Sequence, residues 1–270
     1  MVDLSSKLTS GSGESAGSLN RAAVILTTIA RGSSKGSLLT ELITRTGLPR
    51  TTVVRTLDAL QSLGWVERNT QTSRFNLGVD LAAIGYSAIS RNPLERTAAT
   101  ELSKLAEKLN QVVYLAIRSG LDMVCIGRYE SKSIIQVGRG GPGLRGPFGM
   151  TQSCMGVLAC LPEQEVYEII QANMARYHRI EGFDERGFRQ TVSDALKNGY
   201  GTYDNIILDR TTSGLGVAIK DSSGYPIAGI GTTFITGWLN EEQHLKCLEE
   251  LRSSALRIEK QLFQEQFQYN

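Results

Sequence analysis

The stretch TELITRTGLPRTTVVRTLDALQSLGWVER, residues 40–68, holds two helical patterns separated by a short break. Gly47 is expected to end the first helix, because glycine readily takes the left-handed conformation found at helix C-termini. In the second pattern Val53, Leu57 and Leu60 recur on one side, while Arg and Thr residues gather at its start. An apolar docking side and a polar start after a tight turn are typical of the second helix of a helix-turn-helix module.

The flanking sequence completes this module. Residues 18–31 carry apolar side chains at helical spacing, with Ser18 as the expected N-cap, and Ser37 is expected to cap the next helix. Pro49 is expected at the first position of the third helix, where its missing N–H costs nothing. The segment WVERNTQTSRFNLG then alternates and turns around NTQTS, which predicts a hairpin. Three helices and a hairpin predict a winged helix-turn-helix domain over residues 18–77.

Composition and charge bound the remaining possibilities. The 270 residues suffice for two domains, and the net charge of +2 is unevenly spread. Residues 18–77 hold eight basic and three acidic residues, a net charge of +5, so we expect a polyanionic partner for this segment. Residues 1–17, rich in Gly and Ser, are expected to form a flexible tail. No apolar run is long enough for a membrane span or a secretory signal, which predicts a cytoplasmic protein without a membrane partner.

The second half of the chain has a different pattern. Residues 78–92 are expected to form a linker helix, and residues 93–270 a second domain. In that domain strand pairs are predicted around RSGLD and DSSG, a further strand at SIIQVGRG, a Gly/Pro loop at GGPGLRGPFG, and helices elsewhere, including a long C-terminal one. Strand pairs separated by helices predict an α+β fold with helices packed on an antiparallel sheet.

Residues for catalysis or metal binding are sparse. The four cysteines form no CxxC pair, and only His178 and His244 are present, so we expect no metal site. Cys154 with His178 is the one Cys/His combination to consider, and His178 has no evident orienting acid. No Gly-rich phosphate loop opens a helix. We therefore expect neither a cofactor nor an enzymatic activity.

Several motifs together resemble one family. They are LNRAAVILTTIA, the opening stretch, FNLGVDLAAIG, RGPFGMTQSCMGVLACLP, LKNGYGTYDNI and LGVAIKDSSGYPIAGIGTT. In this order they are similar to the IclR family of bacterial transcription regulators. The resemblance implies an N-terminal DNA-binding domain, a linker helix and a C-terminal GAF-like α/β effector-binding domain. It also implies homodimers, or dimers of dimers, on palindromic double-stranded DNA operators, and a small organic effector such as an aromatic or aliphatic acid.

The DNA-binding residues are expected at the start of the third helix, in the second helix and at the wing. Arg side chains there can pair bidentately with guanine or bind phosphate, and Thr51 and Thr52 can donate to phosphate or contact a thymine methyl group. The alternative for the Arg residues is a solvated helix face, and for Ser37 a capping role alone. The predicted set is Ser37, Thr40, Pro49, Arg50, Thr51, Thr52, Arg55 and Arg74.

The effector residues follow from the family positions near the MTQSCMG helix. This chain departs from the family there: Gly149 replaces a common His, and Asp204 is followed by Asn instead of a second acid. Gln152 and Ser153 could hold an oxygen of the ligand or only cap the helix, and Cys154 could line the pocket or be a buried thiol. The predicted set is Arg139, Phe148, Met150, Gln152, Ser153, Cys154, Tyr203, Asp204, Thr212 and Ser213, with Arg139 either pairing with an acidic effector or remaining a solvated loop charge.

The resulting prediction is a sequence-specific DNA-binding regulator, a repressor in preference to an activator, whose operator binding responds to a small catabolic metabolite. The alternative is an architectural DNA-binding dimer that takes no ligand.

Overall fold

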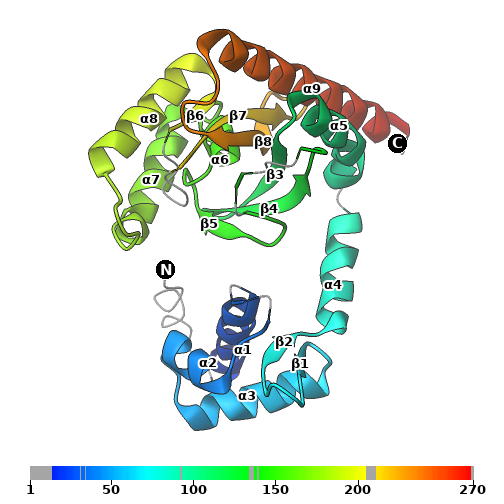
Figure 1. Cartoon of the computed structure of the whole chain (residues 1–270), viewed down its shortest axis with the longest axis vertical. Helices are drawn as coiled ribbons and strands as arrows, with labels where there is room; N and C mark the ends of the chain where they lie inside the picture. Colours follow the sequence, from blue (N-terminus) through cyan, green and yellow to red (C-terminus); the bar gives the residue numbers. More distant parts are fainter. Residues whose placement is uncertain are drawn as a thin grey trace. The chain divides into compact units, whose positions relative to one another are not determined.

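The computed structural model describes residues 14–30, 32–33, 35–91, 93–133, 137–138, 140–204 and 211–268. The chain divides into two compact units, one up to Arg91 and one from Asn92 onwards (Figure 1). Each unit is described by itself below.

The N-terminal unit is a winged helix-turn-helix, as predicted. Its core joins the apolar sides of three helices to the first residues of the two wing strands, with Ile25, Leu42, Val53 and Val66 all buried. The wing strands pair antiparallel, with Val66 opposite Leu77. The elements are α1 (Glu14–Ala30), α2 (Leu39–Thr46), α3 (Arg50–Ser62), β1 (Val66–Arg68), β2 (Phe75–Leu77) and α4 (Val79–Ser90).

Three details at the helix starts correct the sequence prediction. α1 begins at Glu14, so Ser18 lies inside the helix and is not its N-cap. Ser37 does not cap α2, because its backbone pairs with Phe75 in both directions, at 3.0 and 2.8 Å. The cap position is Leu38, whose N–H donates to the Glu41 carboxylate at 2.8 Å. Pro49 is the residue before the first helical residue of α3 and not the first one itself.

The C-terminal unit is built on an antiparallel sheet with helices packed on it, which confirms the α+β prediction. Within the described residues the strand order is β5-β4-β3-β8-β7-β6. Two short edge strands, β5 and β6, lie in segments where the sequence did not predict strands. The elements are α5 (Pro93–Leu109), β3 (Val112–Ser119), β4 (Asp122–Tyr129), β5 (Arg145–Pro147), α6 (Gln152–Leu158), α7 (Glu163–Tyr177), α8 (Glu185–Asn198), β6 (Gly201–Tyr203), β7 (Thr212–Lys220), β8 (Pro226–Ile235) and α9 (Glu241–Gln268).

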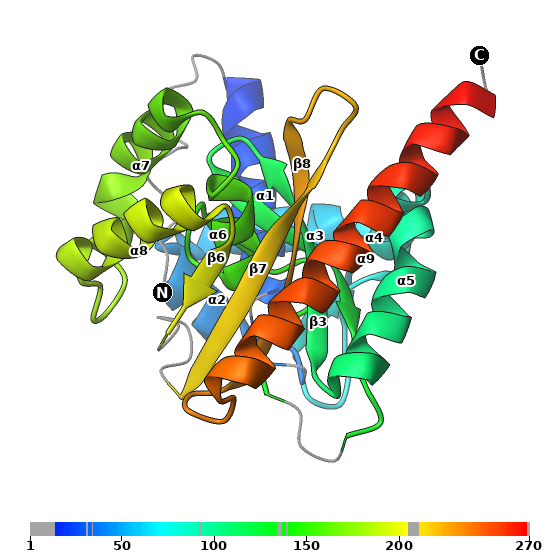
Figure 2. The same cartoon turned by 90° about the horizontal axis from the view of Figure 1, so that it is seen from above.

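The two faces of this sheet carry separate cores. On one face α5 and α9 pack on side chains such as Leu115, Leu215 and Ile230. On the other face α6, α7 and α8 enclose a core that includes Met155 and Phe188 (Figure 2). The alternation of side chains along each strand divides the residues between the two cores.

Glycines on β7 and β8 let α6 lie directly against the sheet. A Cβ added at Gly216 would collide with the carbonyl of Gln152, and one added at Gly229 would collide with the carbonyl of Ser153. The backbone of the first turn of α6 therefore touches the backbone of β7 and β8. No other residue type permits this approach, since every other side chain begins with a Cβ.

We expect Gly216→Ala and Gly229→Ala each to lower the free energy of unfolding by about 1–3 kcal/mol or more, because α6 would have to move off the sheet. Urea unfolding followed by circular dichroism measures this. The matched control is Gly146→Ala in β5, where an added Cβ meets nothing within 4 Å. Equal stability of all three variants would contradict the close-packing argument.

Candidate functional sites

The start of α3 presents a polar surface on a firmly docked helix. Arg50, Thr51 and Arg55 are exposed and Thr52 is half-buried. On the opposite side Val53 and Leu57 are buried in the core of the unit. The predicted separation of an apolar docking side from a basic and hydroxyl-bearing side is therefore present in the structure.

The remaining predicted DNA-binding residues lie in different environments. Thr40 in α2 and Pro49 before α3 are exposed. The side chain of Ser37 is buried, only 1% exposed, and points to no solvent, so its predicted phosphate contact does not fit this structure. Arg74 donates to the carbonyl of Gly36 at 2.8 Å and lies 3.5 Å from the Glu41 carboxylate. Arg74 thus ties the wing to the segment before α2.

One cavity of the C-terminal unit has a volume of about 250 Å³. It lies between the start of α6, strands β3 and β4, and the segment that leads into β5. Four predicted effector residues line it, namely Met150, Gln152, Ser153 and Thr212. The other described lining residues, which the sequence did not single out, are Tyr114, Ala116, Met123, Cys125, Gly138, Gly140, Leu144, Arg145, Gly146, Pro147, Thr151, Ile180 and Thr233.

The cavity has polar groups among a mostly apolar lining. Ser153 is 2% exposed, and its Oγ has no hydrogen-bond partner among the described residues. Gln152 is 5% exposed and lies beside it at the start of α6. The helix is capped by Thr151, whose Oγ1 accepts from the N–H of Cys154, so capping is not the role of Gln152 or Ser153. A buried hydroxyl without a partner is costly unless a ligand or water satisfies it.

A cluster of charges stands at the edge of this cavity. The Nε of Arg145 lies 2.6 Å from the Asp122 carboxylate, and Arg176 binds the other oxygen of Asp122 at 2.5 Å. Asp122 is almost completely buried, and the two guanidinium groups compensate its charge. Arg145 is therefore held in a defined position where it borders the cavity.

A second arginine fixes the wall opposite α6. The Nη1 of Arg128 donates to the Tyr114 hydroxyl at 2.7 Å and to the carbonyls of Gly138 and Gly140 at 2.9 and 2.7 Å. Burial raises the pKa of the Tyr114 phenol, which keeps its proton available for donation. The alternation along β3 could have indicated Tyr114, since it shares a strand face with Ala116. No sequence pattern predicts the hydrogen bonds from Arg128 to the carbonyls of Gly138 and Gly140.

Several predicted effector residues do not line this cavity. Phe148 is buried in the core and accepts a hydrogen bond from the Tyr177 hydroxyl at 2.5 Å. Ser213 pairs with the Thr236 hydroxyl at 2.9 Å. Tyr203 is buried in the same core as Phe148, and Asp204 is exposed at the end of β6. Arg139 lies outside the described residues, as do residues 134–136 of the predicted strand SIIQVGRG.

Cys154 is a buried structural thiol. Its Sγ accepts from the N–H of Gly149 at 2.7 Å, and burial raises its pKa far above the usual range. His178 lies 3.1 Å from the Glu185 carboxylate. Cys154 and His178 are thus bonded to Gly149 and Glu185 and not to each other. A neutral buried thiol is also a poor nucleophile. No cluster of three metal-ligating side chains occurs among the described residues.

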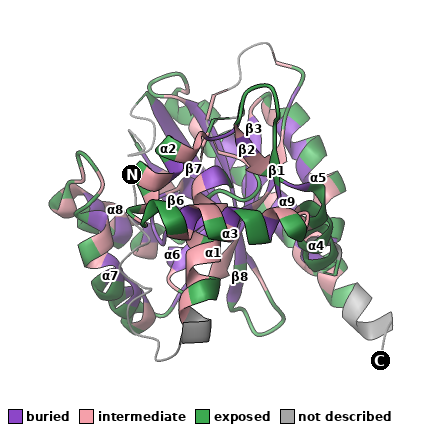
Figure 3. Cartoon of the chain, turned by 90° about the horizontal axis from the view of Figure 1, so that it is seen from below, coloured by how far each residue is buried: buried purple, intermediate pink, exposed green. Residues whose placement is uncertain are grey.

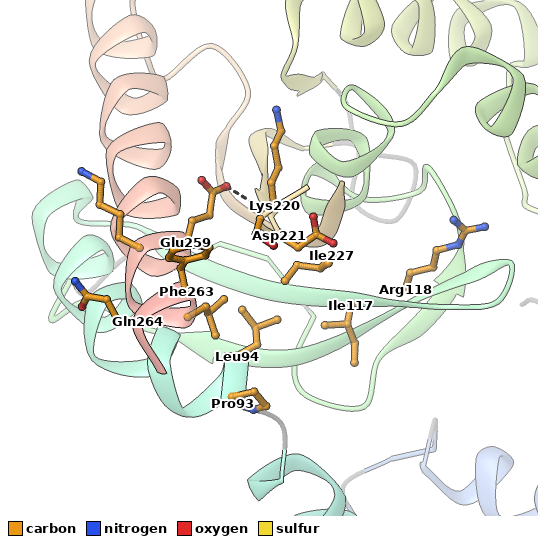
Figure 4. A pocket seen from close by; sticks show the side chains of 13 residues that line it. Pro93, Leu94, Ile117, Arg118, Lys220, Asp221, Ile227, Glu259, Phe263 and Gln264 are labelled. Atoms are coloured by element: carbon orange, nitrogen blue, oxygen red, sulfur yellow. Dashed lines mark hydrogen bonds between the residues drawn. The ribbon is translucent and has the colours of Figure 1, made fainter. Parts of the chain in front are cut away.

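A second, more open cavity of about 570 Å³ lies on the other side of the sheet (Figure 4). It is bounded by the start of α5, the β7–β8 turn and the last turns of α9. Glu259 accepts from the backbone N–H of Lys220 at 2.7 Å, and Arg118 is paired with Glu165. None of the predicted site residues lines this cavity.

A winged helix-turn-helix with an exposed basic helix start, followed by a unit with an enclosed cavity, defines a DNA-binding regulator with a ligand-binding domain. The comparisons with known proteins agree. The profile of the IclR helix-turn-helix domain matches residues 18–70, and the profile of the bacterial transcriptional regulator IclR C-terminal domain matches residues 86–260. The chain belongs to the IclR family of transcriptional regulators. In the described residues no helix has both the length and the apolar character needed to cross a membrane.

Individual relatives are distant. The transcriptional repressor AllR of Escherichia coli K12 is 24% identical over 232 residues, covering 84% of this chain and 83% of AllR. An IclR regulator from Alicyclobacillus acidocaldarius has a TM-score of 0.74 at 21% identity, over 90% of this chain and 97% of that one. An IclR homologue from Microbacterium hydrocarbonoxydans, crystallised with 4-hydroxybenzoate, has a TM-score of 0.68 at 21% identity, over 90% and 98%. At these identities the solved structures establish the shared fold alone.

We expect the thiols to be largely unreactive in the folded protein. Cys125, Cys154 and Cys247 are buried, with the pKa of Cys125 raised by burial to about 11, while Cys160 is half-buried. Titration with Ellman's reagent at pH 7 should modify at most Cys160, and all four cysteines after unfolding in guanidinium. Fast modification of Cys154 in the native protein, located by mass spectrometry, would contradict its structural role.

Proposed function

We propose that this protein is a sequence-specific DNA-binding regulator, acting as a repressor, whose affinity for a palindromic operator is changed by a small organic effector. The observation that carries this proposal is the start of α3. Arg50, Thr51 and Arg55 are exposed there, while the other side of the helix is locked into a core by Val53 and Leu57. Such a helix can enter a major groove without rearrangement of its own domain.

The proposed division of labour follows the chain. Residues 18–77 read DNA, residues 78–92 form the linker, and residues 93–270 bind the effector. Within the reading domain Arg50 and Arg55 are the base-reading candidates. Thr40, Pro49, Thr51 and Thr52 approach the phosphate backbone. The ion pair and hydrogen bond of Arg74 give it a positioning role for the wing, and Ser37 is not part of the proposed surface.

The proposed effector site is the cavity of about 250 Å³ beside α6. Its lining fits a small molecule with an apolar or aromatic body and polar groups that meet the Ser153 hydroxyl and the Gln152 amide. The similarity to a homologue crystallised with 4-hydroxybenzoate supports an aromatic acid as a first candidate. Repression is supported by the similarity to a relative described as a repressor.

The effector can act only by binding two arrangements of the protein with different affinity. The helix α4 connects the wing to the ligand-binding unit along the chain. A conformational change in the ligand-binding unit is transmitted to the DNA-binding unit through this helix. In a dimer, the spacing of two copies of α3 has to match two half-sites about one helical turn of DNA apart. A change in that spacing would alter operator affinity without altering any base contact.

The DNA-binding proposal predicts that Arg50→Ala and Arg55→Ala each weaken binding to a duplex selected from a random library by about 10- to 100-fold. Loss of a base-reading Arg should also remove the preference for one base at one position of the duplex. Loss of a phosphate-binding Arg should instead weaken binding to all sequences alike and reduce the salt dependence of binding. Gel-shift titrations at several salt concentrations measure both. The control is Arg186→Ala on the exposed side of α8, and unchanged affinity in both α3 variants would refute the assignment.

The effector proposal predicts that a member of a panel of aromatic and aliphatic acids, 4-hydroxybenzoate included, raises the melting temperature. Gln152→Leu should weaken that ligand by about tenfold or more, because a buried polar partner is lost. The control is Gln171→Leu on the exposed side of α7. Stabilisation by highly polar diacids alone would contradict the apolar character assigned to the ligand. Operator binding with no stabilising ligand in the panel would favour the architectural dimer instead.

A further inference from the structure

The second cavity, of about 570 Å³, is built from residues that the proposed function does not use. It lies on the face of the sheet that carries α5 and α9, whereas the effector cavity lies on the face that carries α6. Ala116 of β3 lines the effector cavity and the next residue, Ile117, lines the second one, because successive side chains of a strand point to opposite faces. The two cavities are therefore separate, and both can be occupied at once.

Apolar side chains from α5, β3, β8 and α9 converge in the second cavity. Figure 4 shows Leu94, Ile117, Ile227 and Phe263 gathered around a common space. Leu94 is buried, but Ile227 is 36% exposed and Phe263 is 47% exposed. Large apolar side chains that face one hollow and stay open to solvent mark an interaction site, whereas single exposed ones do not. The interior of this cavity suits the apolar body of a ligand.

The acidic side chains at the cavity are used by the fold. Strands β7 and β8 are buried along most of their length, whereas the turn that joins them is exposed and bounds the cavity (Figure 3). Asp221 accepts from the backbone N–H groups of Ser223 and Tyr225 in this turn, at 2.8 and 3.1 Å. Glu259 of α9 accepts from the N–H of Lys220 at 2.7 Å, which ties the helix to the end of β7. Both acids thus have backbone partners.

Two of the basic side chains at the cavity have no such partner. Arg118 is paired with Glu165 and donates to the Tyr225 hydroxyl at 3.2 Å. The ammonium groups of Lys220 and Lys260, by contrast, form no ion pair within the part of the chain that the structure describes. Lys220 is half-buried and Lys260 is exposed. Positive charge beside an apolar hollow attracts an anion to it.

We propose that the second cavity binds a small organic anion with an aliphatic body, namely a medium-chain carboxylate. The alkyl chain would lie among Leu94, Ile117 and Phe263, and the carboxylate would pair with Lys220 and Lys260. A lysine ammonium group is a compact charge on a flexible stem, so it can follow the carboxylate without a fixed geometry. A highly polar ligand would leave the apolar side chains in contact with water, and a cationic one would meet like charges.

The position of the cavity brings a ligand close to the linker along the chain. Pro93, the first residue of α5, lines the cavity together with Leu94, and α4 ends at Ser90. A bound carboxylate would therefore contact the first residues that follow the linker, on a path that does not pass through the effector cavity. The site would serve as a second input to the regulator. Its occupancy does not depend on the proposed operator binding.

Isothermal titration calorimetry of the full-length protein with sodium decanoate tests the site. We expect saturable binding with a dissociation constant below about 1 mM. The double variant Lys220→Met, Lys260→Met should raise this constant by about tenfold or more, because both charges are lost while the aliphatic stems are kept. The control is Lys246→Met, an exposed position on the same helix α9.

The choice of ligand is tested with decyltrimethylammonium, a cation with a chain of the same length. It should bind at least about tenfold more weakly than decanoate, because it carries the wrong charge. Absence of saturable decanoate binding would overturn the proposal. Equal affinity for the cation, or unchanged decanoate affinity in the double lysine variant, would overturn it as well.

A further pair of variants separates the two cavities. Ile227→Glu should raise the decanoate dissociation constant by about tenfold or more, because it places a carboxylate against the alkyl chain. Gln152→Leu should leave that constant unchanged, since Gln152 lines the cavity on the other face of the sheet. Circular dichroism should show native helix content in both variants. Loss of binding in Gln152→Leu with full binding in Ile227→Glu would assign decanoate to the effector cavity and refute the second site. None of these measurements contains DNA, so a failure of operator binding would be seen separately.

Discussion

The backbone contact between α6 and strands β7 and β8 constrains the whole C-terminal unit. It exists because Gly216 and Gly229 have no side chain at the point where the carbonyls of Gln152 and Ser153 approach. Gly156 makes the same kind of contact from the helix side, against the backbone of Val217. With α6 fixed at this depth, the cavity beside its first turn has a defined floor. Gln152 and Ser153, which line that cavity from α6, are therefore held in place by the contact of the helix with the sheet.

Electrostatics completes the cavity from two sides. Asp122, almost fully buried, holds Arg145 at one edge and is itself held by Arg176. Arg128 holds the other wall through Tyr114 and two backbone carbonyls. Among the described residues, the Asp122 oxygens meet Arg145 and Arg176 in ion pairs, whereas the Ser153 hydroxyl at the floor has no hydrogen-bond partner. The free-energy cost of burying an unpaired polar group therefore falls on Ser153, at the place where a ligand would bind.

Local sequence signals predicted most of the fold and only part of the candidate sites. Apolar spacing and turn residues indicated α2, α3, the wing and both long hairpins, because those elements are specified by residues close in the chain. The edge strands β5 and β6 have three residues each, too few for a period of two to show. Ser37 resembles a helix cap in sequence but pairs with Phe75, a contact across 38 residues. Arg145 reaches the edge of the cavity through the pairing of β5 with β4 and the ion pair with Asp122, which no local pattern encodes.

The anchor of the cavity wall has a consequence for how members of one family diverge. Arg128 holds Gly138 and Gly140 through their backbone carbonyls, which every amino acid possesses. Gly138 itself has a φ of 102° and no room for a Cβ beside the Tyr114 hydroxyl, but the 40% exposed side chain of Leu144 takes no part in the attachment and can be exchanged without loss of it. The glycine-bound floor, by contrast, tolerates almost no substitution. Substitutions in the wall held by Arg128 can therefore change which ligand is preferred, while the packing of α6 on the sheet stays the same.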